Sequence, residues 1–146
     1  MKVFPDLQTL ADASLDEVNQ VWAGLGYYRR ARFIHASAQQ LVQQHQGQFP
    51  NNIEALLKLP GIGLSTAGAI LAQAFDIPAA ILDGNVKRIL TRFFLVPGYP
   101  DHPRTMKQLW LLANQLIPQE HAAIYTQGIM DLGATLCTKS QPQCES

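Results

Sequence analysis

The chain has 146 residues, of which 47% are hydrophobic, and this content excludes an intrinsically disordered polypeptide. There are 11 basic residues (lysine and arginine) and 11 acidic residues (aspartate and glutamate), so the net charge is zero. This argues against a domain that binds nucleic acid by overall positive charge, although a local basic face remains compatible with it. No apolar run approaches the roughly 18 residues of a membrane span, and the start MKVFPDLQTLADASL lacks the apolar core of a signal peptide. We therefore expect a cytoplasmic protein without membrane contact.

Apolar residues recur at helical spacing along almost the whole chain, and no strand pattern is found. The segment SLDEVNQVW begins with the capping-box pair Ser14 and Glu17. After a break at residues 23–26, a second helix is predicted from Tyr28 to the terminating Gly47. The pattern predicts an all-α fold.

The rest of the chain continues as helical segments broken by proline and glycine. The segment NNIEALLKL has a second capping-box spacing, at Asn51 and Glu54. It is followed in chain order by STAGAILAQAF, GNVKRILTRFFL, TMKQLWLLANQLI and EHAAIYTQGIMDLGATL. Pro78 marks the predicted boundary between a first lobe, residues 1–77, and a second lobe, residues 78–146.

The stretch LKLPGIGLSTAGAIL predicts two helices joined by a very tight turn. Pro60 stops the first helix, and Gly61 and Gly63 flank Ile62. Both glycines allow positive φ and a close backbone approach. Amides around the two glycines and Leu64 are then free to bind a phosphate oxygen. An isolated G-x-G is more often an ordinary helical corner, but this longer pattern is typical of a helix-hairpin-helix element that contacts the DNA backbone irrespective of sequence. A monovalent cation bound by the hairpin carbonyls is common in such elements.

Asp83 stands between the apolar run AAIL and the helical segment GNVKRIL. Its position directly before Gly84 is that of a helix N-cap. A carboxylate at this place could also do chemistry, and the sequence around it favours one class of reaction.

Four stretches resemble the adenine DNA glycosylases of the MutY type, within the helix-hairpin-helix base-excision superfamily: VWAGLGYYRRAR, LPGIGLSTAGAIL, ILDGNVKRIL and MDLGATLCTKSQPQC. They are distributed over nearly the whole chain. The resemblance implies a helix-hairpin-helix glycosylase fold, with residues 1–77 as a partial six-helix barrel lobe that contains the hairpin at 52–74. Residues 78–146 would begin the iron–sulfur cluster lobe and end in a truncated cluster loop, 137–146.

The resemblance also implies a reaction and its residues. Asp83 matches the carboxylate that faces the sugar when the N-glycosidic bond of adenine, mispaired with 8-oxoguanine or guanine, is hydrolysed. Ser65 stands where bifunctional relatives carry the lysine that forms a Schiff base, so a monofunctional enzyme acting through water is expected. Asn85 would orient Asp83 or a water molecule, or only cap the first helical turn. Ser65 and Asn85 are thus expected to support the catalytic pocket.

The expected partner is double-stranded DNA with an extruded adenine, met at the nucleoid if the source is bacterial. Tyr27 matches a family tyrosine near the lesion. Lys87 and Arg88 could contact phosphate or the cluster loop. Alternatively, either of them could form a salt bridge with Asp131. The arginines of YYRRAR form either a phosphate-facing patch or a solvated face. The remaining expected DNA contacts lie in and after the turn: Pro60, Gly61, Ile62, Gly63, Leu64 and Ser65.

Cys137 and Cys144 have the first spacing of the family's C-x6-C-x2-C-x5-C pattern and would be two of the four ligands of a [4Fe-4S] cluster. Since four thiolates are needed, residues 1–146 alone are not expected to hold a stable cluster. The family's catalytic glutamate lies in an upstream helix that has no match here. We therefore expect residues 1–146 alone to be inactive, and to self-associate through apolar surface that missing helices would cover.

Two other functions are compatible with the same residues. A thymine- or uracil-mismatch glycosylase would also lack the lysine at Ser65. A non-catalytic helix-hairpin-helix module would keep the DNA-binding turn and leave Asp83 as a helix cap only.

Overall fold

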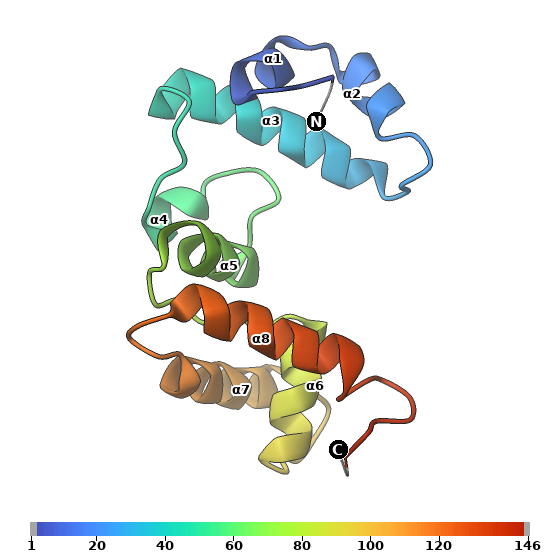
Figure 1. The fold of residues 1–146 in the computed structure, drawn as a ribbon, viewed down its shortest axis with the longest axis vertical. Helices are drawn as coiled ribbons and strands as arrows, with labels where there is room; N and C mark the ends of the chain where they lie inside the picture. The colour runs from blue at the N-terminus through green and yellow to red at the C-terminus, as the bar shows by residue number, and fades with distance from the viewer. Residues whose placement is uncertain (1–2, 145–146) are drawn as a thin grey trace. The chain divides into compact units, whose positions relative to one another are not determined.

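The computed structural model describes residues 3–144, which form helices and loops without a strand (Figure 1). This confirms the all-α prediction. The helices in chain order are α1 (Leu7–Asp12), α2 (Leu15–Val21), α3 (Tyr28–His45), α4 (Ile53–Leu56), α5 (Leu64–Phe75), α6 (Gly84–Phe93), α7 (Pro103–Leu116) and α8 (Ala122–Thr135). Among them, none combines the length and the apolar content needed to cross a membrane.

The chain divides into two compact units, one ending at Gly63 and the other beginning at Leu64. This division falls inside the predicted hairpin and differs from the predicted boundary at residues 77 and 78. The reason is that α5 packs with the later helices: Gln73 Nε2 donates to Gln127 Oε1 on α8 at 3.0 Å. The first unit therefore holds α1 to α4, and the second holds α5 to α8.

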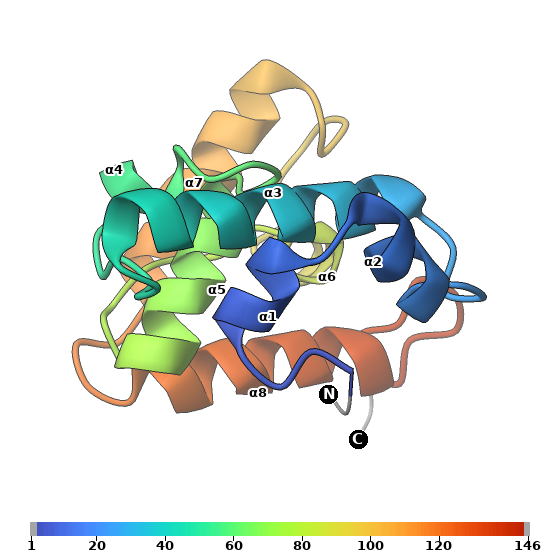
Figure 2. The same ribbon diagram turned by 90° about the horizontal axis from the view of Figure 1, so that it is seen from above.

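In the first unit, the long helix α3 carries α1 and α2 along its length (Figure 2). Ala31, Ala38 and Leu41 are buried on the helical face that this packing covers. His35, also buried, lies with Nε2 2.9 Å from the carbonyl oxygen of Ala13, in the link between α1 and α2. The apolar and polar contacts together fix α3 as the scaffold of this unit.

The two predicted capping boxes have different outcomes. The first is confirmed, because the Ser14 amide and hydroxyl both donate to the Glu17 carboxylate and the Glu17 amide donates to Ser14 Oγ. The two hydrogen bonds to the carboxylate hold the pKa of Glu17 below its usual value. The second is wrong, because α4 begins one residue later than its pattern indicated. The N-cap is Asn52, whose Oδ1 accepts from the Ala55 amide at 2.9 Å.

The core of the second unit is formed by α6, α7 and the extended segment that leads into α6. Its buried residues include Ile81, Leu82, Leu90 and Leu109. The helix α8 packs against both α5 and α6. Asp76, just after α5, caps α8 from outside the helix, since its Oδ1 accepts from the Ala123 amide at 2.9 Å.

Candidate active site and nucleic-acid interface

The turn at residues 60–63 lies at the end of the first unit. Gly61 has φ +76°, and a Cβ added to it would lie 2.6 Å from Phe33 Cδ2 on α3. Only glycine fits this place without displacing the ring. Of the two glycines, Gly61 adopts the positive φ that both allow, whereas Gly63 is outside the left-handed region and has open space around it. The half-buried Ile62 donates its amide to the Leu59 carbonyl at 3.2 Å.

Carbonyl groups of the turn are partly engaged by α3. Ser37 Oγ donates to the Pro60 carbonyl at 2.9 Å, and Gln40 Nε2 donates to the Lys58 carbonyl at 3.4 Å. The monovalent cation at the hairpin stays a prediction. The exposed face of the turn is the side of Gly61 and Gly63.

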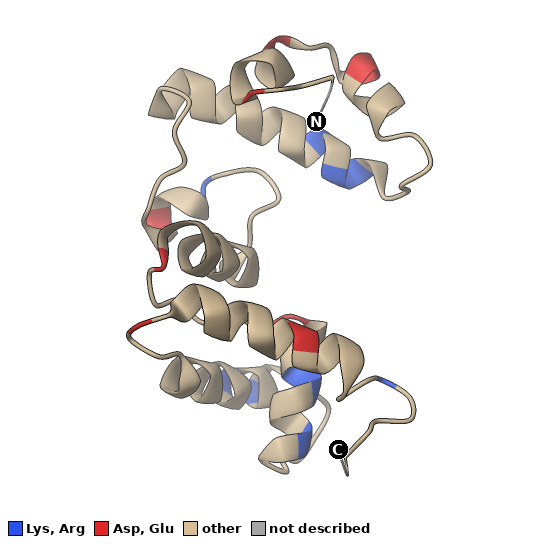
Figure 3. Cartoon of the chain, in the orientation of Figure 1, with Lys and Arg blue, Asp and Glu red and all other residues tan. Residues whose placement is uncertain are grey.

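The start of α3 carries aromatic and basic side chains together, and Figure 3 marks the basic residues at this end of the helix. Tyr27, 76% exposed, has φ +50° and precedes the first turn of α3. Arg30 lies over its ring at 4.8 Å from the centroid, and Arg29 lies over the ring of Phe33 at 5.2 Å. These cation–π contacts hold two of the three guanidinium groups at the surface, available to a phosphate.

In the second unit, Asp83 is the N-cap of α6. Its Oδ1 accepts from the Val86 amide at 2.8 Å, so the predicted cap is confirmed. The preceding residues Ala80, Ile81 and Leu82 are buried, which anchors the backbone that presents Asp83. The cap uses Oδ1 of the carboxylate, and the Asp83 side chain is half-exposed.

Two residues of α5 hold the backbone directly before Asp83. Ser65 Oγ accepts from the Leu82 amide at 3.0 Å. A Cβ added to Gly68 would lie 2.2 Å from the Ala80 carbonyl oxygen, so α5 lies directly on this segment. Ser65 is thus placed beside the residue that precedes Asp83, and its hydroxyl is engaged with backbone.

Asn85 points to α8. Its Oδ1 accepts from Arg88 Nη2 at 2.9 Å, and a Cβ added to Gly133 would lie 2.6 Å from Asn85 Cβ. This hydrogen bond of Asn85 Oδ1 therefore goes to Arg88, and not to Asp83 or a first-turn amide, two of the roles expected from the sequence. The same guanidinium of Arg88 donates to the Gly133 carbonyl at 2.6 Å.

The basic residues of α6 have separate partners. Lys87 Nζ pairs with Asp101 in the loop before α7. Arg88 Nε donates to the carbonyl of Cys137 at 2.7 Å, which confirms the predicted contact with the cluster loop. The alternative pairing with Asp131 is wrong, because Lys87 pairs with Asp101 and Arg88 donates to the Cys137 and Gly133 carbonyls.

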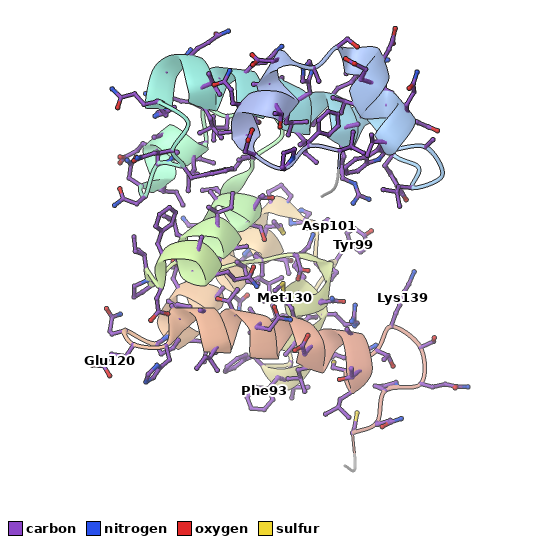
Figure 4. The ribbon with its side chains drawn as sticks, turned by 45° about the horizontal axis from the view of Figure 1, so that its top comes forward. Phe93, Tyr99, Asp101, Glu120, Met130 and Lys139 are labelled. Atoms are coloured by element: carbon purple, nitrogen blue, oxygen red, sulfur yellow. The ribbon has the colours of Figure 1, made fainter. Side chains whose placement is uncertain are left out.

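The segment after α8 is held by a residue that the sequence reasoning missed. Arg92, one helical turn after Arg88, donates to the Thr138 and Lys139 carbonyls at 2.7 and 3.1 Å, and Nη1 lies 3.5 Å from Cys137 Sγ. Its i, i+4 spacing from Arg88 was the available signal. Lys139 extends from this loop in Figure 4.

The two cysteines fit part of a cluster ligand set. Cys137 is half-buried and Cys144 is exposed, and both are free thiols. Within residues 3–144, no group of three or more histidine, cysteine or acidic side chains is placed to hold a metal ion. The donor type and the anchored Cys137 backbone fit a thiolate-bound cluster, for which these residues would supply two ligands.

Comparisons with known proteins identify the family of the chain. The profile of the HhH-GPD superfamily base excision DNA repair proteins matches residues 1–115. The adenine DNA glycosylase of Buchnera aphidicola subsp. Schizaphis graminum is 43% identical over 141 residues, covering 97% of this chain and 41% of that protein. The human adenine DNA glycosylase is 44% identical over 145 residues, covering 99% of this chain and 27% of that protein. The chain thus spans less than half the length of these curated relatives.

Solved structures with the same fold include two glycosylases. A thermostable thymine-DNA glycosylase matches with a TM-score of 0.87 and 28% identity, over 99% of this chain and 67% of that one. Endonuclease III, in a non-covalent complex with DNA, matches with a TM-score of 0.81 and 27% identity, over 99% of this chain and 66% of that one. The resemblance and the fold inferred from the motifs are confirmed, and the chain belongs to the HhH-GPD superfamily of base excision DNA repair proteins.

Proposed function

We propose that this chain is the part of an adenine DNA glycosylase that binds duplex DNA and presents the sugar-facing carboxylate. The observation that carries the proposal is the 43–44% identity to adenine DNA glycosylases over nearly the whole chain. The solved thymine-DNA glycosylase and endonuclease III are 28% and 27% identical, which favours adenine as the excised base. The expected substrate is adenine opposite 8-oxoguanine or guanine.

Breaking the N-glycosidic bond of adenine places positive charge on the deoxyribose, and Asp83 supplies the negative charge that stabilises it. The Val86 amide fixes Oδ1, and this leaves Oδ2 to face the sugar or to orient the attacking water. Because the bond to Val86 holds the carboxylate before substrate arrives, little reorganisation is needed in the transition state.

Ser65 favours hydrolysis over lyase chemistry. A hydroxyl cannot form a Schiff base with the sugar, and the Ser65 hydroxyl already accepts a hydrogen bond from the Leu82 amide. The strand should therefore remain intact at an abasic site after the base has left.

The departing adenine needs a proton from a second group. In the second unit, the carboxylates of Asp76, Asp101 and Asp131 are engaged with Ala123, Lys87 and Gln127 respectively. We propose none of these three acids as that proton donor. We expect residues 1–146 alone to bind DNA and to excise adenine poorly.

DNA binding is proposed to use backbone amides more than charge. The turn at Gly61 and Gly63 would donate N–H groups to phosphate oxygens, and Tyr27 with the arginines of α3 would contact the strand near the extruded base. For Lys87 to contact a phosphate, its ion pair with Asp101 would have to break. With few lysine or arginine contacts to phosphate, affinity should fall only modestly with salt.

Cys137 and Cys144 are proposed as two of the four thiolates of a [4Fe-4S] cluster, which would serve as a structural brace for the C-terminal loop. Arg88 and Arg92 attach this loop to α6 through backbone carbonyls. The loop around Cys137 is thus ordered by protein contacts in addition to any metal.

Self-association of residues 1–146 is proposed through an apolar groove between α6 and α8. The groove has a volume of about 340 Å³ and is almost without polar surface. Phe93, labelled in Figure 4, lies at its edge and is 78% exposed. Burial raises the pKa of Tyr125, which also lines the groove. Its lining residues are Ile89, Leu90, Phe93, Phe94, Leu116, Tyr125, Gly128, Ile129 and Leu132.

A charge placed in this groove should therefore prevent self-association. We expect residues 1–146 to form dimers or larger species by light scattering, and Phe93→Glu to run as a monomer, because the charge cannot be buried against a second copy. Tyr99→Glu changes a similarly exposed aromatic residue outside the groove, 73% against 78%, and should leave the wild-type behaviour unchanged. A monomeric wild-type chain would refute the proposal.

The test of the proposed function uses a chimeric enzyme, in which residues 1–146 replace the matching part of the Buchnera adenine DNA glycosylase. Released bases are identified after single-turnover reactions with duplexes that contain A opposite 8-oxoguanine, A opposite G, T opposite G, or U opposite G. Adenine release from the first two duplexes is expected. Release of thymine or uracil alone would establish a mismatch glycosylase instead, which the TM-score of 0.87 to the thymine-DNA glycosylase makes the second candidate. A chimera that folds and binds duplex DNA without releasing any base would favour a non-catalytic module.

A further inference from the structure

Ser37 on α3 holds the turn that is proposed to contact DNA. Its side chain is buried, with 7% of its surface exposed, and Oγ donates to the Pro60 carbonyl at 2.9 Å. Gln40, on the same side of α3, reaches the Lys58 carbonyl at 3.4 Å. Two hydrogen bonds, to the carbonyl oxygens of Lys58 and Pro60, thus attach the turn to α3.

This attachment fixes the direction of one amide. The peptide group between Pro60 and Gly61 is planar, and in a trans peptide the C=O and N–H point in opposite directions. Because Ser37 holds the C=O toward α3, the Gly61 N–H points to the other side of the turn. Phe33 fills the space on the α3 side, where a Cβ on Gly61 would lie 2.6 Å from its ring.

We propose that Ser37 is a positioning residue for DNA binding, which orients the Pro60–Gly61 peptide so that the Gly61 N–H donates to a phosphate oxygen. The inference rests on the proposed function, in which this turn meets the DNA backbone. Without the hydroxyl, the peptide group can rotate in the free protein, and fixing it on binding costs conformational entropy. The loss should be the same for every duplex sequence, because phosphates carry no base identity.

The test measures the affinity of residues 1–146 for an undamaged duplex oligonucleotide. Ser37→Ala should bind about fivefold more weakly, the effect of one neutral hydrogen bond. Ser37→Thr keeps the hydroxyl and should restore wild-type affinity. Ser14→Ala is the matched control: it removes a hydroxyl that bonds within the capping box of α2, in the same unit but outside the turn, and should leave affinity unchanged. If Ser37→Ala does not fold, Ser37→Cys, with its weaker donor, takes its place with the same expected direction.

A second measurement reports the peptide orientation without DNA. The Pro60 carbonyl ¹³C resonance should shift in Ser37→Ala and return in Ser37→Thr, because it senses the hydrogen bond. Equal affinity of Ser37→Ala and wild type would overturn the inference, and so would an unmoved Pro60 resonance. A folded wild-type chain that binds no duplex would overturn the proposed function of the turn as well, so the two failures are distinguished.

Discussion

Asp83→Asn abolishes adenine release by the chimeric enzyme, on the order of 10³-fold or more, because the neutral amide cannot stabilise positive charge on the sugar. Asparagine is as good an N-cap as aspartate, so the bond to the Val86 amide and the start of α6 are expected to survive. The measurement is a single-turnover rate with a duplex containing A opposite 8-oxoguanine.

Two comparisons separate chemistry from folding in this variant. Duplex affinity and the thermal midpoint of Asp83→Asn should equal those of the wild type, whereas Asp83→Ala should also lose about 1 kcal/mol of stability with its cap. If Asp83→Asn retained a rate near that of the wild type, Asp83 would be a structural cap only, as in the non-catalytic alternative.

The largest effect on stability is expected for Gly68→Ala. The new Cβ would lie 2.2 Å from the Ala80 carbonyl oxygen, a backbone atom in a buried segment. Relief requires α5 to move away, which also breaks the bond from the Leu82 amide to Ser65. Overpacking of this kind costs about 2–3 kcal/mol, to be measured by urea unfolding of residues 1–146 at low concentration.

Gly128→Ala is the matched control for this substitution. Gly128 lies inside α8 with no atom near the position of an added Cβ, so alanine should stabilise the chain by about 0.5–1 kcal/mol through helix propensity alone. Equal stability of Gly68→Ala and the wild type would contradict the close contact between α5 and the segment before Asp83.

The sequence was sufficient for features that depend on local pattern. Helical periodicity predicted the all-α fold, and the spacing of Ser14 and Glu17 predicted a capping box that the structure contains. The same pattern misplaced the start of α4, because two adjacent asparagines, Asn51 and Asn52, are chemically equivalent caps and only backbone geometry selects between them.

Contacts between segments that are distant in the sequence could not be predicted from the local residue pattern. The pairing of Lys87 with Asp101 depends on where the loop before α7 returns, and the cap that Asp76 supplies to α8 depends on the packing of α5. The motif also placed two glycines in the turn without showing that only Gly61 adopts positive φ, or that only Gly61 lies against Phe33. The position of Asp83 was predictable, while the contacts that hold its backbone through Ser65 and Gly68 required the structure.

The central claim is that Asp83 promotes hydrolysis of the adenine glycosidic bond at a site where Ser65 replaces a Schiff-base lysine. The most direct measurement follows both products of a single turnover by the chimeric enzyme on A opposite 8-oxoguanine, with borohydride present in a parallel reaction. The prediction is free adenine in an amount equal to the abasic sites, an intact strand and no trapped protein–DNA adduct. Strand cleavage with a trapped adduct, or failure of a folded, DNA-binding chimera to release adenine, would contradict it.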